Sequence, residues 1–267
     1  MPRANRYHIP GQIWHITQRC HKGDFLFKFA KDRKAWVDWL FEAKKRYGLI
    51  VLDYIVTSNH IHLLVVDDKS DAISKSIQLI AGRTAREFNR RKGRRGAYWE
   101  DRYHATAIEC GEHLLRCLVY IDMNMVRAGA VSHPSEWVHG GYREIQQPPL
   151  RYRLIDREKL IALCGMQSDQ QLVSDHQSWI ELAAQNDHLE RQEKWSEAVC
   201  VGSEGFVKQL KHQLGSEAPG RKVKIESESY VLREPVASYD AFFDPEKESL
   251  GIDNGVFFDE NSIELKS

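Results

Sequence analysis

Residues 49–66 read LIVLDYIVTSNHIHLLVV, two apolar segments joined by a short polar turn. The first segment, 49–57, is rich in β-branched residues and predicts a strongly apolar strand. The second, His60–Val66, predicts the next strand. Alternate residues of a strand project to the same face, so His60 and His62 are expected to point together while the isoleucine between them points away. The stretch therefore predicts two strands with a pair of neighbouring imidazoles on one face.

Further elements on both sides of this pair are predicted from hydrophobic periodicity and from turn residues. We expect a strand at 13–17, a helix at 30–47 ending at Gly48, a helix at 71–91, a strand at 104–109 and a helix at 111–126. The order β-α-β-β-α-β-α predicts an α+β fold, a ferredoxin-like βαββαβ antiparallel sheet with an added C-terminal helix. Helices cover one face of such a sheet and leave the other available for a site.

The chain changes character after residue 147. A Pro-Pro pair marks a plausible boundary there, and short helical patterns follow before the periodicity fades. We expect one domain over 1–147, a small mainly helical appendage of unassigned role over 148–214, and a loosely ordered tail over 215–267.

The overall composition excludes several classes of protein. The 267 residues are 42% hydrophobic, with a mean hydropathy of −0.52, which is typical of a soluble globular chain. No apolar run approaches the roughly 20 residues that span a bilayer, and the first residues lack the apolar stretch of a secretory signal. The five cysteines are scattered without a CxxC pair, which argues against a disulfide framework and a zinc–thiolate site and fits a reducing cytosol.

Charge is distributed unevenly although the total is neutral, with 38 basic and 38 acidic side chains. Residues 1–150 hold 24 Lys and Arg against 16 Asp and Glu, a balance of +8, so residues 151–267 carry −8. Such asymmetry suggests that one half binds nucleic acid. The run RTAREFNRRKGRR at 83–95 concentrates the basic charge. It is either a solvated helix face with a flexible loop or a phosphate-binding surface, and the charge asymmetry favours the second.

Two candidate groups for chemistry follow from residue type and spacing. Two neutral imidazoles side by side, His60 and His62, are a good partial site for a divalent metal, although an HxH pattern is also compatible with two partly exposed sheet histidines. Tyr120 and Asn124 lie four residues apart and share one helical face, with Arg127 one turn beyond. Tyr120 alone is more typical of a core aromatic, but a tyrosine can attack phosphorus when a metal neutralises the phosphate.

Three ordered blocks give the chain a resemblance to a known family. NHIHLL at 59–64 resembles the HUH motif of single-tyrosine transposases, and YIDMNMVRAG at 120–129 is similar to the block that holds their nucleophile. YWEDRYHAT at 98–106 and the opening PRANR resemble further stretches of the same family. The chain is thus similar over about residues 1–145 to the REP-associated tyrosine transposases of the HUH single-tyrosine, insertion-sequence-like superfamily. Met125 departs from the pattern, since the family usually has proline there.

This resemblance implies a site and a reaction. His60 and His62 are expected to bind Mg²⁺ or Mn²⁺, with Asn124 as a third ligand. Tyr120 is expected to attack a phosphodiester of single-stranded, hairpin-containing or palindromic DNA, leaving a 5′-phosphotyrosyl enzyme and a free 3′-hydroxyl, and a 3′-hydroxyl then reseals the strand. The arginines expected to contact DNA are Arg3, Arg6, Arg83, Arg86, Arg90, Arg91, Arg94, Arg95, Arg102 and Arg127, although Arg102 is equally suited to pair with Glu100 or Asp101.

The resemblance leaves the assembly and the exact activity open. The protein is expected to act as a monomer or homodimer in the bacterial cytoplasm beside the nucleoid, without a membrane partner. Two alternatives stand beside strand transfer. The same metal site could activate water, giving a plain phosphodiesterase, or the protein could bind structured nucleic acid without catalysis.

Overall fold

The computed structural model describes residues 9, 11–68, 71–185, 192–215, 221–226 and 229–233. Its first half has the expected α+β order. The elements are β1 (Ile13–Arg19), α1 (Ala30–Tyr47), β2 (Ile50–Val56), β3 (His60–Val66), α2 (Ala72–Lys92), β4 (His104–Ile108) and α3 (Glu112–Asp122). The strands lie in the order β2-β3-β1-β4, and each neighbouring pair is antiparallel. This is the predicted ferredoxin-like arrangement.

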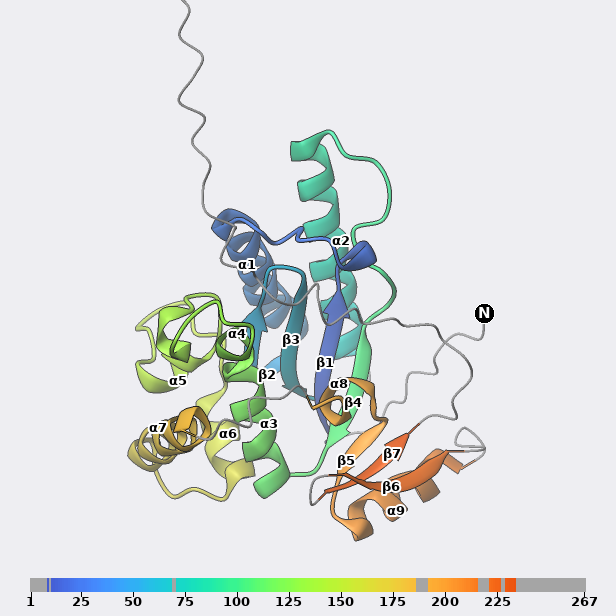
Figure 1. Ribbon diagram of the computed structural model, residues 1–267, viewed down its shortest axis with the longest axis vertical. Helices are drawn as coiled ribbons and strands as arrows, with labels where there is room; N and C mark the ends of the chain where they lie inside the picture. Colours follow the sequence, from blue (N-terminus) through green and yellow to red (C-terminus); the bar gives the residue numbers. More distant parts are fainter. Residues whose placement is uncertain are drawn as a thin grey trace, which may run out of the picture.

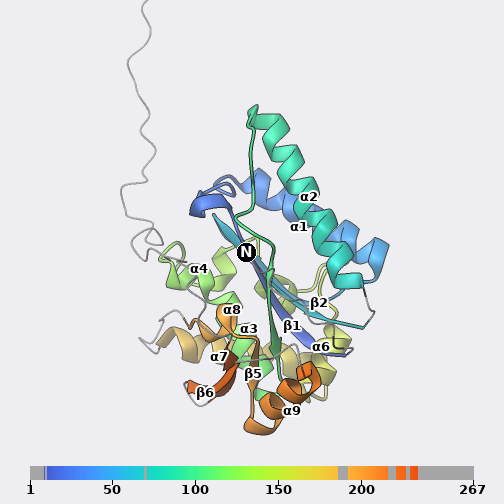
Figure 2. The same ribbon diagram turned by 90° about the vertical axis from the view of Figure 1, so that its right-hand side faces the viewer.

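Apolar strands form the centre of the molecule, and helices cover both faces of the sheet. Figure 2 shows α1 and α2 on one side and α3 on the other. Each of the two long helices ends at a glycine, Gly48 or Gly93, in the left-handed conformation with φ of 68° and 59°. A glycine adopts this conformation without the steric penalty of a Cβ, which fixes where both helices stop.

Register across β1 and β3 determines which side chains share a face. Thr17 lies opposite His62, and Arg19 lies opposite His60. Because opposite residues of an antiparallel pair point the same way, His15, two residues before Thr17, shares the face of both HIH imidazoles.

The helix predicted over 111–126 is divided in the structure. α3 ends at Asp122, and a four-residue helix, α4 (Asn124–Arg127), follows Met123, whose φ and ψ are −76° and 0°. Backbone bonds still run from the Met123 amide to Val119 and from the Arg127 amide to Met123, at 3.0 and 2.9 Å. The chain therefore continues on a nearly helical path through the division.

The C-terminal part differs most from the sequence prediction. The short helices expected there are present, but the segment also adds strands to the sheet. β5 (Cys200–Gly202) runs parallel to β4, β7 (Ser229–Arg233) pairs with β5, and β6 (Lys222–Glu226) pairs with β7. The prediction of a mainly helical 148–214 missed β5, and the prediction of a loosely ordered 215–267 is wrong for β6 and β7. The rest of that tail lies outside the described residues.

The other helices lie mostly in the second half. They are η1 (His21–Gly23), η2 (Pro134–Glu136), α5 (Tyr142–Gln146), α6 (Arg157–Cys164), α7 (Asp169–Gln185), α8 (Lys194–Glu197) and α9 (Glu204–Leu214). Figure 1 shows α8 in front of β1 and β4, and α8 contacts both strands. In the ranges that the structure describes, no helix combines the length and apolar character that crossing a bilayer requires.

Candidate active site

The two histidines of the HIH motif lie next to each other on β3, and α3 brings Tyr120 to them. The ring centroids of His60 and His62 are 4.9 Å apart, and the Tyr120 ring centroid is 5.7 Å from that of His62. Nδ2 of Asn124, at the start of α4, lies 3.0 Å from Nε2 of His62. The structure therefore brings together the four side chains that the sequence singled out for chemistry.

Hydrogen bonds in the β2–β3 turn orient His60. Its Nδ1 lies 2.6 Å from Oδ1 of Asn59, whose own amide group donates to the Gly23 carbonyl at 3.4 Å. Because Asn59 presents its oxygen, Nδ1 of His60 is the protonated nitrogen and donates. Nε2 of His60 is then the nitrogen with a lone pair.

His62 is almost fully buried and belongs to a row of hydrogen bonds. Its Nδ1 lies 2.9 Å from Nε2 of His15, and Nδ1 of His15 lies 2.7 Å from the backbone oxygen of Trp195 in α8. The rings of His15 and His62 stack at 5.0 Å. Complete burial lowers the pKa of His15 to about 4, against a smaller opposing effect of the hydrogen bond to Trp195. His15 is thus a neutral imidazole at physiological pH.

Tyr120 is enclosed by aromatic and cationic side chains, and its residue is 7% exposed. The Arg127 guanidinium lies 4.2 Å from the ring centroid and also donates to the Tyr120 carbonyl at 2.7 Å. The indole of Trp195 packs against the same ring at 6.1 Å between centroids. The region predicted to be an appendage therefore contacts the candidate nucleophile directly.

The donor atoms of this cluster fit a divalent cation. Nδ1 of each imidazole is used inside the protein, so both Nε2 atoms are acceptors. Nε2 of His62 accepts a hydrogen bond from Nδ2 of Asn124 at 3.0 Å, and a cation bound there would replace this hydrogen, with Asn124 turned to offer its amide oxygen. Two imidazole nitrogens and one oxygen suit Mn²⁺ better than Mg²⁺, which prefers oxygen ligands. Within the described residues no group of three or more His, Cys, Asp and Glu side chains is placed to hold a metal, so a cation here relies on the amide and on oxygens of the substrate.

The arginines predicted to contact DNA have different surroundings. Arg91 forms an ion pair with Asp32, Arg94 donates to Asn89 and to the Ala97 carbonyl, and Arg83 lies over the Trp39 ring. By contrast, Arg86, Arg90, Arg95 and Arg102 are exposed. Glu100 pairs with Arg19 at 3.9 Å, and within the described residues Arg102 forms no ion pair with Glu100 or Asp101. Arg3 and Arg6 lie outside the described residues.

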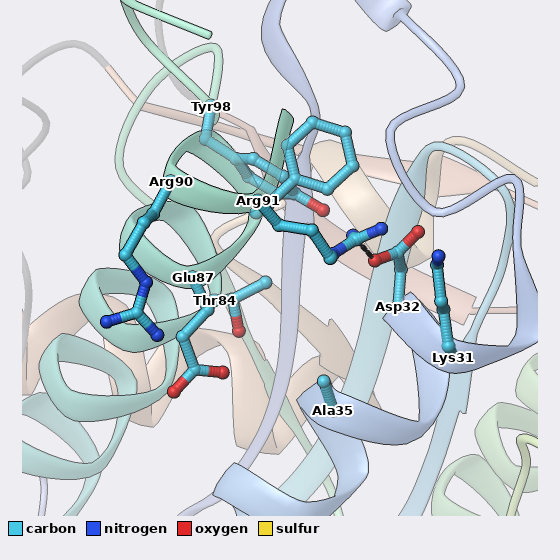
Figure 3. A pocket seen from close by; sticks show the side chains of 9 residues that line it. Lys31, Asp32, Ala35, Thr84, Glu87, Arg90, Arg91 and Tyr98 are labelled. Atoms are coloured by element: carbon cyan, nitrogen blue, oxygen red, sulfur yellow. Dashed lines mark hydrogen bonds and ion pairs between the residues drawn. The ribbon is translucent and has the colours of Figure 1, made fainter. Parts of the chain in front are cut away.

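Part of the basic run lines a pocket of about 310 Å³ between α1 and α2. Figure 3 shows Arg91 reaching across it to Asp32 and Arg90 at its edge. Figure 1 shows the C-terminal end of α2, which holds these arginines, extending beyond the sheet. The basic charge therefore lies on a projecting helix end on the other side of the sheet from Tyr120.

Residue type and spacing singled out neither His15 nor Trp195 for the site. His15 and Thr17 are two residues apart on β1 and therefore share one face. Once Thr17 is paired with His62, His15 lies on the face of the HIH pair. No residue-type pattern marks Trp195, because its contribution to the hydrogen-bond row is a backbone carbonyl.

A comparison with family models identifies the first half of the chain. The model of IS200-like transposases matches residues 13–124, from the start of β1 to Asn124. These residues are similar to the IS200-like transposases. The match ends in the candidate site and includes His60, His62 and Tyr120. The matched region thus contains all four clustered side chains.

Solved structures give two more distant similarities. A REP-associated tyrosine transposase bound to a REP hairpin is 19% identical, with a TM-score of 0.46, over 57% of this chain and 90% of that one. A crystal structure described as that of a candidate transposase from Deinococcus radiodurans R1 is 16% identical, with a TM-score of 0.31, over 43% of this chain and 89% of that one. No curated protein matches the chain.

Proposed function

We propose that this protein is a metal-dependent transposase that cleaves and rejoins single-stranded DNA through a 5′-phosphotyrosine on Tyr120. Its substrate is DNA with a hairpin or palindromic repeat, and its domain extends over 1–147. The main support is one contact: the Tyr120 ring lies 5.7 Å from His62, a histidine whose Nε2 is its acceptor nitrogen and faces Asn124. A phenol and an imidazole suited to a cation thus lie close together, which supports a reaction of both with one phosphodiester.

In this mechanism the side chains have separate tasks. The Tyr120 oxygen attacks phosphorus, the bond from phosphorus to the 3′ oxygen breaks, and the phenol proton passes to that oxygen as it becomes a 3′-hydroxyl. A cation bound by His60, His62 and Asn124 supplies Lewis-acid stabilisation of the phosphate charge. A 3′-hydroxyl then attacks the phosphotyrosine and releases Tyr120. One phosphodiester is lost and one is made, so neither ATP nor water is consumed.

Binding of the strand is assigned to exposed basic side chains. The guanidiniums of Arg86, Arg90, Arg95 and Arg102 are exposed and suited to phosphates. Arg127 lies over the Tyr120 ring, where its positive charge can offset the negative charge of an attacked phosphate. Because Tyr120 is 7% exposed, the strand reaches the phenol only when the side chains above it move. Such a reaction belongs in the cytoplasm, at the nucleoid.

Covalent trapping tests this proposal. The full-length protein is incubated with Mn²⁺ and end-labelled single-stranded hairpin DNA, and adducts that resist denaturation are counted on a gel. Wild type is expected to form the adduct and Tyr120→Phe to form none. Tyr47→Phe, at the end of α1 and remote from the histidines, serves as the matched control and is expected to behave as wild type.

Two other outcomes separate the alternative functions. Cleavage that survives Tyr120→Phe without any adduct would identify a phosphodiesterase that uses water. Hairpin binding without cleavage by wild type, in either Mn²⁺ or Mg²⁺, would identify a protein that only binds structured DNA. Either result rejects the proposed mechanism.

A further inference from the structure

We propose that His15 is a positioning residue of the active site, which holds His62 in the Nδ1–H tautomer through a hydrogen bond anchored on the Trp195 backbone carbonyl. The inference rests on the proposed function, because the tautomer matters for a cation at His62. It assigns a role to the C-terminal part of the chain, which supplies the anchor.

The direction of each hydrogen bond follows from donors and acceptors alone. A carbonyl oxygen only accepts, so Nδ1 of His15 donates to Trp195 across 2.7 Å. Nδ2 of Asn124 is a donor and lies 3.0 Å from Nε2 of His62, so this Nε2 accepts and the N–H of His62 is on Nδ1. The 2.9 Å contact between Nε2 of His15 and Nδ1 of His62 therefore requires His62 to donate from Nδ1. The lone pair of His62 is therefore on Nε2, where Asn124 donates to it.

This lone pair faces the place where a cation is needed. Nε2 of His62 lies 3.0 Å from the Asn124 amide, within the cluster that includes His60 and Tyr120. The β2–β3 turn gives His60 the same tautomer by a separate route, through Asn59. Metal-binding histidines depend on such partners at the second ring nitrogen, which fix the tautomer and the ring orientation.

The anchor is itself firmly attached to the sheet. The Ala198 carbonyl, three residues after Trp195, accepts hydrogen bonds from Thr106 and His104 of β4 at 2.7 and 3.0 Å. The Val199 amide donates to Leu232 of β7 at 2.7 Å. The segment that follows Trp195 is thereby tied to β4 and β7, so the Trp195 carbonyl can orient an imidazole without a motif of its own.

The test compares three full-length proteins. His15→Phe keeps a ring but removes both hydrogen bonds. His15→Gln keeps a donor and an acceptor on one amide group, and is the conservative rescue. His113→Phe removes a partly buried histidine that pairs with Glu109 instead, and is the matched control. Thermal unfolding and hairpin binding without metal establish that each variant is folded.

The first measurement is the tautomer of His62 in metal-free protein, read from two-bond ¹H–¹⁵N correlations of ¹⁵N-histidine-labelled samples. Wild type and His113→Phe are expected to show Nδ1–H at His62, and His15→Phe is expected to lose this preference. The second measurement is Mn²⁺ affinity by titration, which is expected to fall about 10- to 100-fold in His15→Phe, as for other outer-shell partners. His15→Gln is expected to recover much of it.

An Nε2–H tautomer at His62 in wild type, or an unchanged tautomer in His15→Phe, would overturn the inference. These outcomes are distinct from a failure of the proposed function. If Tyr120→Phe still forms the adduct, Tyr120 is not the nucleophile. The tautomer of His62 still tests the role of His15. If wild type binds no Mn²⁺, the metal site is rejected, but the spectra of metal-free protein still show whether His15 fixes the tautomer of His62.

Discussion

Two parts of the chain meet at the candidate site and contribute in different ways. The region similar to IS200-like transposases, 13–124, supplies the candidate reactive side chains, namely His60, His62 and Tyr120. The C-terminal part supplies a backbone carbonyl and a covering indole, both from Trp195. The first contribution is visible as a sequence motif, whereas the second depends only on where the backbone passes. The role of a side chain can thus be predicted from a sequence motif even where the groups that orient it cannot.

The largest effect is expected when both proposed imidazole ligands are removed. His60→Ala combined with His62→Ala removes both imidazole donors, and several kcal/mol of transition-state stabilisation with them. Formation of the DNA adduct is expected to fall at least about a thousandfold, since each 1.36 kcal/mol is a factor of ten. Single-turnover trapping in Mn²⁺ measures the fall. Hairpin affinity without metal is the control and is expected to stay within about twofold of wild type, as the exposed arginines are untouched.

A second effect tests whether the C-terminal part also supports the nucleophile helix. His176 of α7 lies 2.8 Å from Asp122, the last residue of α3, and both side chains are almost completely buried. Replacing one member leaves the other buried without its partner. His176→Phe is therefore expected to lower the free energy of unfolding by about 3 kcal/mol, measured by urea denaturation.

A compensating variant distinguishes the pair from simple packing. Changing Asp122 to Leu in the His176→Phe background removes the orphaned charge, and is expected to restore at least half of the lost stability. If this double variant is less stable than His176→Phe alone, the pair is not the source of the effect.

Strands and helices of the first half could be predicted closely from the sequence, because each has a strong period and a clear end. The helix at 30–47 ends at Gly48 as expected, since the left-handed C-cap there favours glycine. The division of the predicted 111–126 helix at Met123 was missed, since nothing in the residue types there disfavours a helix. β5, with three residues, is too short to show alternation, and its place in the sheet depends on pairing with β4.

The candidate site, like the fold, could be predicted only in part from the sequence. His60, His62, Tyr120 and Asn124 were predicted from spacing and resemblance, and the structure places them together. The row from His62 through His15 to the Trp195 carbonyl was not predicted, because a link across about 180 residues leaves no local pattern.

A third prediction divides the basic run into two functional groups. Arg90 and Arg95 are exposed. Arg91 instead pairs with Asp32, and Arg94 donates to Asn89 and to the Ala97 carbonyl. Each phosphate contact contributes roughly 0.7 to 0.9 to the slope of log K against log salt, so the double variant Arg90→Ala, Arg95→Ala is expected to lower this slope by about 1.5. Fluorescence anisotropy of labelled hairpin DNA across a salt series measures it.

The matched variant is Arg91→Ala, Arg94→Ala, which removes the same charge. It is expected to change the slope by less, because these guanidiniums are already engaged inside the protein. Equal slopes for the two variants would mean that only net charge matters, and that the intramolecular partners do not decide which arginines contact DNA.

The smallest effect concerns how the Trp195 carbonyl is held. Arg233 of β7 pairs with Glu226 at 2.8 Å and with Glu197 of α8 at 3.3 Å, and its side chain is 20% exposed. Partly exposed ion pairs contribute about 1 kcal/mol or less, and α8 is also held by the hydrogen bonds on Ala198 and Val199. Arg233→Ala is therefore expected to lower Mn²⁺ affinity by only about twofold, while amide exchange at Val199 becomes faster. A fall in affinity as large as that of His15→Phe would show instead that the ion pairs of Arg233, rather than the hydrogen bonds to β4 and β7, hold the carbonyl on which His15 depends.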